Sequence, residues 1–133
     1  MKSFQERVDK SITRIAKLVF PNDTTHNHTL YGGTAMHWMD EVGFLVSTRF
    51  SRQKCVTVSM DRVDFKVPIP EGSIVELIGK VTRVGNTSMT VRVQVFMEDM
   101  FEGNQTLAVS AEMVFVALGD DNKPTQLSVH EQS

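Results

Sequence analysis

Hydrophobic and polar residues alternate in four long stretches of the chain, and this period of two predicts β-strands. The stretches cover residues 56–67, 75–83, 91–97 and 107–117. In the first of them the phase of the alternation changes near Asp61, which predicts a β-bulge. A shorter alternating stretch over residues 14–20 ends at Pro21 and predicts one more strand. The turns between the long strands are short, so most neighbouring strands are expected to be antiparallel.

A long segment without proline begins at Gly32 and Gly33 and reaches about Phe50. On a helix its apolar residues cover almost the whole circumference, so this helix is expected to be enclosed by protein on most sides. A short amphipathic helix is predicted over residues 4–12. The order of strand, buried helix and four long strands predicts an α+β fold, in which one curled antiparallel sheet wraps around the central helix.

Such a single sheet leaves its edges and the ends of the helix uncovered. We therefore expect self-association, at least as a homodimer whose sheets join edge to edge. Residues 1–120 are predicted to form one domain, and the polar composition of residues 121–133 favours a flexible tail.

The charge balance narrows the classes of partner. The 133 residues include 14 Lys and Arg against 16 Asp and Glu, a net charge of −2. Without a basic run, neither nucleic acid nor an anionic membrane is an expected partner. The polar first ten residues do not resemble a signal peptide, and no apolar stretch approaches the ~18 residues of a membrane span. These features predict a cytoplasmic protein.

Two carboxylates, Asp40 and Glu41, lie in the middle of the predicted central helix. Buried carboxylates need a partner or a pocket. One interpretation pairs them with backbone groups or with an arginine such as Arg49 or Arg62. The other places one of them in a cleft or a subunit interface, where a carboxylate can act as a general base.

The two glycines at the start of this helix allow a second kind of chemistry. The free N–H groups of a first helical turn can stabilise a carbonyl oxygen that gains negative charge. A tight entry turn is the alternative interpretation of Gly32 and Gly33.

The other reactive residue types point to structural roles. His26 and His28 lie in a polar loop and have no further histidine at a metal-binding spacing, so no metal site is predicted. His37 is expected to pair with Glu41 on the helix surface. Cys55 is expected to be a buried structural thiol.

Three groups of segments together resemble the hotdog-fold acyl-CoA thioesterases of the cytosolic acyl-CoA hydrolase type. The segments are residues 18–24, residues 30–33 with 38–43, and residues 56–65 with 68–72, and the turn at 84–88 is similar as well. The resemblance extends over roughly residues 14–118. It implies hydrolysis of acyl-CoA to a free carboxylic acid and CoA, without a cofactor other than the CoA of the substrate and product.

The same resemblance implies a site shared between two subunits of a dimer, further assembled as a trimer of dimers. By position, Asp40 matches the family's catalytic aspartate and Gly33 the glycine that polarises the thioester carbonyl. Thr25 is expected to be the third catalytic residue, because it stands at the asparagine position of the loop that the partner subunit contributes. Whether Asp40 activates water or attacks the thioester directly stays open. Substrate contacts are expected from Asn22, Asn27, Gly32, Thr57, Ser59, Arg62, Thr87 and Ser88, and contacts to the CoA phosphates from Arg52, Lys54 and Lys66.

The sequence departs from the family pattern in three places. Thr25 stands where the family has asparagine, His28 where it has glycine, and Asn86 where a basic residue is common. Threonine is shorter than asparagine, and Asn27 can compensate only if the loop shifts. The alternative function is therefore a non-catalytic acyl-CoA-binding hotdog protein. Dehydration of a hydroxyacyl thioester is disfavoured, because no histidine pairs with the helix carboxylate in the expected manner.

Overall fold

The computed structural model describes residues 3–131. Its elements are α1 (Phe4–Ser11), β1 (Thr13–Leu18), η1 (Pro21–Asp23), α2 (Gly32–Ser51), β2 (Lys54–Phe65), β3 (Ile74–Val84), β4 (Ser88–Glu98), β5 (Gln105–Leu118) and η2 (Ser128–Glu131). The predicted order of strand, central helix and four long strands is confirmed.

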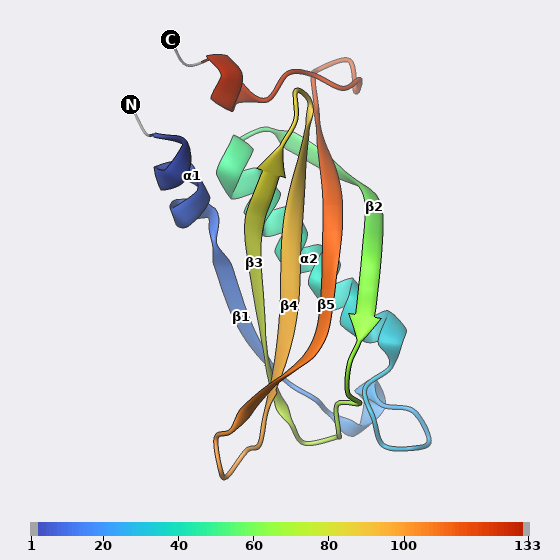
Figure 1. Cartoon of the computed structure of the whole chain (residues 1–133). Helices are drawn as coiled ribbons and strands as arrows, with labels where there is room; N and C mark the ends of the chain where they lie inside the picture. The colour runs from blue at the N-terminus through green and yellow to red at the C-terminus, as the bar shows by residue number, and fades with distance from the viewer. Residues whose placement is uncertain (1–2, 132–133) are drawn as a thin grey trace.

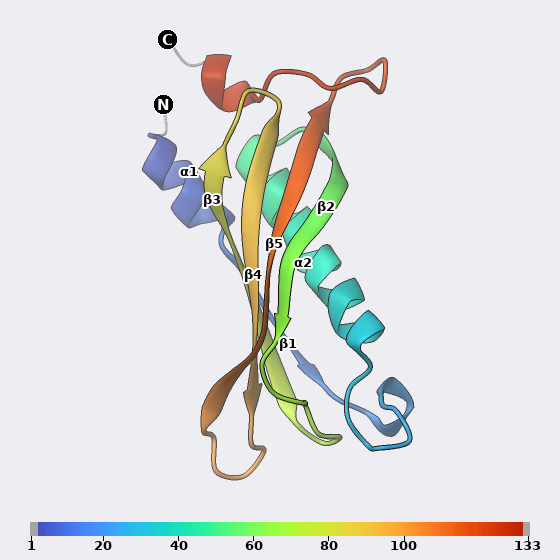
Figure 2. The same cartoon turned by 45° about the vertical axis from the view of Figure 1, so that its right-hand side comes forward.

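The five strands form one antiparallel sheet in the order β1-β3-β4-β5-β2. The sheet curls around α2, which lies along its concave face (Figures 1 and 2). β1 and β2 are therefore the two edges of the sheet. This arrangement confirms the predicted α+β fold with one sheet wrapped around one helix.

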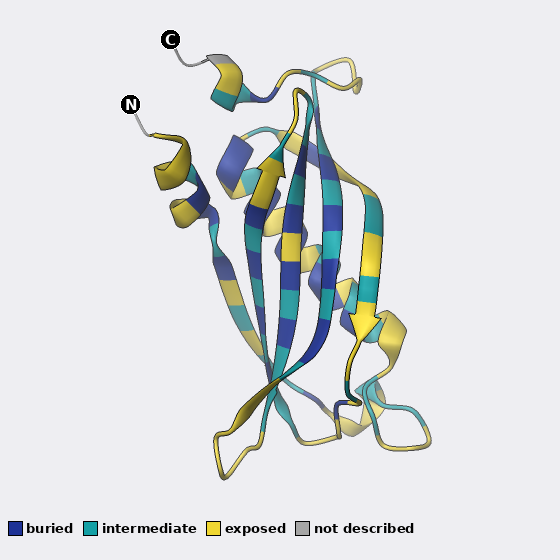
Figure 3. Ribbon diagram, viewed as in Figure 1, coloured by how far each residue is buried: buried dark blue, intermediate teal, exposed yellow. Residues whose placement is uncertain are grey.

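The core lies between α2 and the inward face of the sheet. Burial alternates residue by residue along β3, β4 and β5, as the period of two in the sequence requires (Figure 3). Met39, Val42 and Val46 of α2 are fully buried against this face. Fully burying one such side chain contributes about 1.5–3 kcal/mol, so this contact holds the fold together.

Two glycines let α2 approach the sheet closely. A Cβ atom on Gly79 of β3 would lie 2.8 Å from methyl carbons of both Val42 and Val46, and one on Gly43 would lie 2.7 Å from the ring of Phe115. Real Cβ contacts are not this short, so a larger residue at either position would push the helix and the sheet apart.

The prediction that α2 is enclosed on most sides needs a correction. Phe44 and Leu45 are 48% and 39% exposed, and Glu41 is exposed beside them. The sheet covers only one side of the helix, because five strands do not close around it. An apolar strip on the middle of α2 is therefore uncovered in the single chain.

The bulge that was predicted near Asp61 is confirmed. The register between β2 and β5 shifts between Asp61 and Asp64, and a second shift lies between Thr57 and Ser59. Arg62, which lies in the irregularity between Asp61 and Asp64, has a left-handed backbone with φ of 53°. The strand thus changes which residues face the helix along its length.

The segment after Asp120, predicted as a flexible tail, packs against the domain as far as the structure describes it. Leu127 is fully buried, and its N–H donates to the carbonyl oxygen of Asn86 at 2.9 Å. The Ser128 hydroxyl donates to the carbonyl oxygen of Ser51 at 2.8 Å. Val129 packs against the core as well, so two apolar residues and these hydrogen bonds anchor the polar stretch, and composition alone gave no sign of that.

We predict that Gly79→Ala destabilises the fold by about 1–3 kcal/mol, because the new methyl group overpacks the contact between β3 and α2. Urea unfolding followed by circular dichroism measures the change. Gly33→Ala is the matched control, since a Cβ there meets no atom within 4 Å. Its free energy of unfolding is expected to stay within about 0.5 kcal/mol of the original. Equal stability of the two variants would contradict the prediction.

Candidate functional site

A hydrogen bond between α2 and β2 fixes the central carboxylate. The Thr57 hydroxyl donates to Oδ1 of Asp40 at 2.7 Å. Thr57 faces the helix because the register places it opposite Phe115, a core residue. Asp40 is half-buried on α2, and Thr57 is the only hydrogen-bond partner of its carboxylate within residues 3–131. Oδ2 is therefore available to another molecule.

The two arginines considered as partners for the helix carboxylates lie elsewhere. Arg49 donates to the Thr13 hydroxyl at 3.1 Å, and Arg62 pairs with Glu112 at 3.1 Å on the outer face of the sheet. Glu41 instead lies 3.8 Å from His37, as predicted from their spacing. Within the described residues, no cation neutralises Asp40.

A shallow hollow of about 380 Å³ borders Asp40. Glu41, Phe44 and Leu45 complete its lining, so one wall is acidic and the other is apolar. Sequence reasoning missed Phe44 and Leu45 as site residues. The signal was present, because apolar residues around the full circumference of a helix must include some that the sheet cannot cover.

The start of α2 provides free backbone donors. The first helical hydrogen bond runs from Ala35 N–H to the Tyr31 carbonyl oxygen at 3.0 Å, and the N–H groups of Gly32, Gly33 and Thr34 have no acceptor within residues 3–131. Gly33 is exposed and faces open space. These donors and the positive end of the helix dipole favour an oxygen that carries negative charge.

A second hollow, of about 260 Å³, lies beside this first turn. Leu30, Ala35, Phe65 and Val109 are among its lining residues. The Phe65 ring lies 3.5 Å from the position that a Cβ on Gly32 would take, so the aromatic ring forms one side of the hollow at the start of the helix. A small apolar group fits this space.

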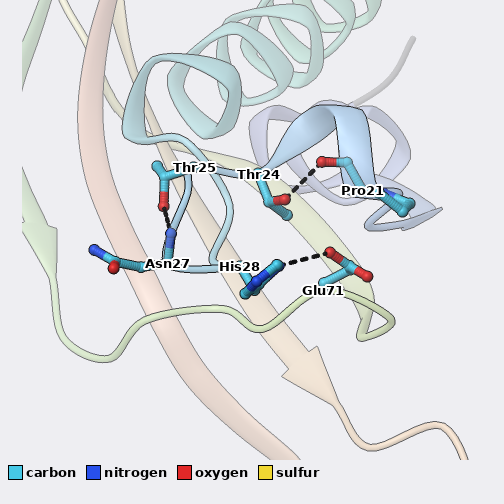
Figure 4. Close-up of polar contacts among 6 residues, drawn as sticks. All are labelled: Pro21, Thr24, Thr25, Asn27, His28 and Glu71. Carbon is cyan, nitrogen blue, oxygen red and sulfur yellow. Dashed lines mark hydrogen bonds and ion pairs between the residues drawn. The ribbon is translucent and has the colours of Figure 1, made fainter.

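The loop that precedes α2 closes on itself in a tight turn. Thr25 N–H donates to the Thr29 carbonyl oxygen at 2.8 Å, and His28 N–H donates to the Thr25 carbonyl oxygen at 2.9 Å. The Thr25 hydroxyl accepts from the backbone N–H of Asn27 at 3.1 Å (Figure 4). Asn22 lies apart from this turn, in the exposed η1.

The backbone conformation at His28 suits the glycine that the resemblance to the family implies at this position. Its φ is 62°, in the left-handed region that side chains other than those of Gly, Asn, Asp and His rarely adopt. In this chain the imidazole Nδ1 lies 3.4 Å from the Glu71 carboxylate (Figure 4). The backbone N–H of Glu71 also donates to the His28 carbonyl oxygen at 2.9 Å, so two contacts hold the strained residue.

Asp40 and the N–H of Gly33 do not meet within one chain. Seven residues separate them on one straight helix, which corresponds to about 10 Å along the axis. A thioester carbonyl that accepts a hydrogen bond at Gly33 is therefore out of reach of a water bound to Asp40 of the same chain. The predicted catalytic groups form two half-sites.

The remaining predicted residues are scattered. Four of them lie towards the C-terminal end of α2: Thr87 in the β3–β4 turn, Ser88 at the start of β4, and Arg52 and Lys54. Lys54 donates to Asn122. The others lie along or just after β2: Ser59 donates to Asp61 at 3.2 Å, Arg62 pairs with Glu112, and Lys66 pairs with Asp64 at 2.7 Å.

Residues 3–131 lack two further kinds of feature. No three His, Cys, Asp or Glu side chains gather there as a metal would need. None of the helices in that part of the chain is long and apolar enough to cross a membrane.

Comparisons with known proteins give one consistent family. The model of the thioesterase superfamily matches residues 27–103. An uncharacterised acyl-CoA thioester hydrolase, YkhA, of Bacillus subtilis is 42% identical over 80% of this chain, which spans 62% of that protein. The cytosolic acyl coenzyme A thioester hydrolase of Rattus norvegicus is 32% identical over 88% of the chain, which spans 31% of it.

Solved structures agree with this family. An acyl-CoA hydrolase from Staphylococcus aureus, in complex with butyryl coenzyme A, coenzyme A and coenzyme A disulfide, is 37% identical with a TM-score of 0.87, covering 90% of this chain and 73% of that one. Further structures of it replace an asparagine, an aspartate or a threonine by alanine. A hexameric acyl-CoA thioesterase is 36% identical with a TM-score of 0.87, covering 90% and 77%. The chain therefore belongs to the thioesterase superfamily and has the hotdog fold of its acyl-CoA hydrolases.

Proposed function

We propose that this protein is an acyl-CoA thioesterase, which hydrolyses acyl-CoA to a free carboxylic acid and CoA. The observation that carries the proposal is the hydrogen bond from Thr57 to Asp40, which orients a half-buried carboxylate with one free oxygen beside an open hollow. A carboxylate so placed can hold and activate a water molecule.

The replaced residues of the Staphylococcus aureus enzyme support this assignment. Its asparagine precedes its aspartate by fifteen positions, and its threonine follows the aspartate by seventeen. Thr25, Asp40 and Thr57 have the same two spacings in this chain. The aspartate and the threonine are thus matched by identical residues, and only the asparagine is replaced.

The mechanism uses water as the nucleophile. Oδ2 of Asp40 takes a proton from the water, and the water oxygen forms a bond to the thioester carbon. The carbonyl oxygen becomes an oxyanion, which a free N–H of the first turn of α2 stabilises. The carbon–sulfur bond then breaks, the CoA thiolate leaves and takes up the proton, and the carboxylic acid remains.

The two half-sites meet between two copies of the chain. One copy supplies Asp40 and Thr57, and the other supplies the first turn of α2 with the loop before it. The exposed strip of Phe44 and Leu45 and the open edge of β2 provide the surface for this pairing. The hexameric relative supports a further assembly as a trimer of dimers.

The apolar hollow beside Phe65 is proposed for the acyl chain. Lys66, which also lines this hollow, is the predicted phosphate contact nearest the start of α2. Arg52 and Lys54 lie at the opposite end of the helix and can serve only a differently placed CoA.

The protein is proposed to act in the cytoplasm.

Asp40→Asn is expected to lower kcat by about 100-fold or more, because a positioned general base contributes roughly 10²–10⁴ to a rate. Thiol release from acyl-CoAs of short, medium and long chains measures the loss. The amide keeps the size of the side chain, so folding and acyl-CoA binding should persist. Near-normal turnover of this variant would refute the mechanism, and tight binding without thiol release by the unaltered chain would favour an acyl-CoA-binding protein instead.

Thr57→Val is expected to lower kcat by about 10- to 100-fold. A hydrogen bond to a charged group is worth about 1.5–3 kcal/mol, and each ~1.4 kcal/mol is a factor of ten in rate. Thr57→Ser keeps the hydroxyl and should retain most of the activity. Steady-state kinetics of both variants test the role of the hydroxyl, which is disproved if valine and serine behave alike.

Phe44→Asp is expected to split the dimer and to lower the activity with it, because the two half-sites then separate. Light scattering after size-exclusion chromatography measures the mass, and thiol release measures the activity. Phe101→Asp is the control, since Phe101 is 93% exposed at the β4–β5 turn and does not line the hollow that Phe44 borders. An active monomer of the Phe44 variant would overturn the shared site.

A further inference from the structure

The proposed mechanism has no residue in the role of the loop asparagine that Thr25 replaces. We propose that Asn27 supplies the missing carboxamide and donates a hydrogen bond to the thioester carbonyl oxygen, while Thr25 positions Asn27. This inference rests on the proposed function. It gives the two residues different roles: Asn27 contacts the substrate, and Thr25 acts through Asn27.

The hydroxyl of Thr25 is committed to the turn. It accepts from the backbone N–H of Asn27 at 3.1 Å, two residues along the chain. Thr25 is half-buried, and its backbone N–H and carbonyl also close the turn through Thr29 and His28. His26 and Asn27 are the two central residues of this turn. All the polar groups of Thr25 thus fix the path of the loop.

The carboxamide of Asn27 is free to contact another molecule. Asn27 is exposed, and its side chain makes no hydrogen bond within residues 3–131. In Figure 4 the amide projects away from the contact between His28 and Glu71. An amide N–H that is exposed and unpaired can donate to a carbonyl oxygen at little desolvation cost.

The turn is held firmly enough to aim that amide. The loop is tied to the segment around Pro70 by the bridge between Thr29 and Pro70, and by the hydrogen bond from Leu30 N–H to the Ile69 carbonyl oxygen at 2.8 Å. The pair of His28 and Glu71 adds a side-chain contact. A donor on a preorganised turn loses little entropy when the substrate binds.

The start of α2 and the turn lie at the same end of the molecule (Figures 1 and 2). Tyr31 N–H donates to the Asp23 carbonyl oxygen at 3.0 Å, which draws the base of the loop to the first residues of the helix. A carbonyl oxygen has two lone pairs. The backbone N–H of Gly33 can satisfy one, and the Asn27 amide supplies a donor for the other.

The test compares thiol release by Asn27→Ala, Asn27→Asp and His26→Ala. Loss of one donor to the oxyanion costs about 10²–10³ in kcat, so Asn27→Ala should lose about 100-fold with KM changed much less. Asn27→Asp keeps the shape but has no N–H to donate, and it should fall as far. His26→Ala, at the other central position of the turn, should leave kcat and KM unchanged.

Two more variants test the relation of Thr25 to Asn27. Thr25→Asn combined with Asn27→Ala returns an amide to the position where relatives carry it, and it should regain at least tenfold over Asn27→Ala alone. Thr25→Ser keeps the acceptor for the Asn27 N–H and should retain kcat. Thr25→Val removes this acceptor and should lower kcat.

The proposal is overturned if Asn27→Ala keeps its turnover within about threefold of the unaltered chain, or if Asn27→Asp is fully active. Activity of the unaltered chain together with either result would refute only the role of Asn27. Absence of thiol release from the unaltered chain would refute the proposed function and this inference together.

Discussion

The close contact between α2 and the concave face of the sheet is the constraint on which the rest of the structure depends. Gly43 and Gly79 have no side chains that would hold the two layers apart, and fully buried residues such as Val42 fill the space around them. This contact fixes the height of α2 above β2. It therefore also sets the distance at which the Thr57 hydroxyl meets Asp40, so the core and the proposed catalytic pair have one common cause.

The one-sided wrapping of the helix links stability to assembly. Five strands cover the buried face of α2 and leave Phe44 and Leu45 on the uncovered face, next to the carboxylate. A surface of this kind is costly in water, and the proposed dimer would cover it with a second copy of the chain. The same geometry separates Asp40 from Gly33 by about 10 Å along the helix. In the proposed dimer, one association would both cover the apolar strip and complete the site.

The loop before α2 shows how this chain accommodates His28 and Thr25, which depart from the pattern of the family that it resembles. His28 adopts the left-handed backbone for which glycine is suited, and its contacts with Glu71 offset the strain. The Thr25 hydroxyl accepts a hydrogen bond from the backbone N–H of Asn27, whereas an asparagine at position 25 would have projected an amide. The substitutions at these positions are coupled through the turn, and reading each one by itself gives an incomplete account of the loop.

The sequence by itself determined the strands, the central helix, the bulge near Asp61 and the two candidate carboxylates Asp40 and Glu41, because periodicity and a charge on an apolar helix are local properties of the chain. The choice of Asp40 between the two carboxylates came from the resemblance to the family. Only the tertiary structure decided that Thr57 is the residue that reaches Asp40, that the face of α2 with Phe44 is left open, and that Leu127 anchors the last segment. The pair of Thr57 and Asp40 depends on the register of β2 against β5 and on the height of the helix above the sheet. Both are set by packing between segments distant in sequence, which no local pattern specifies.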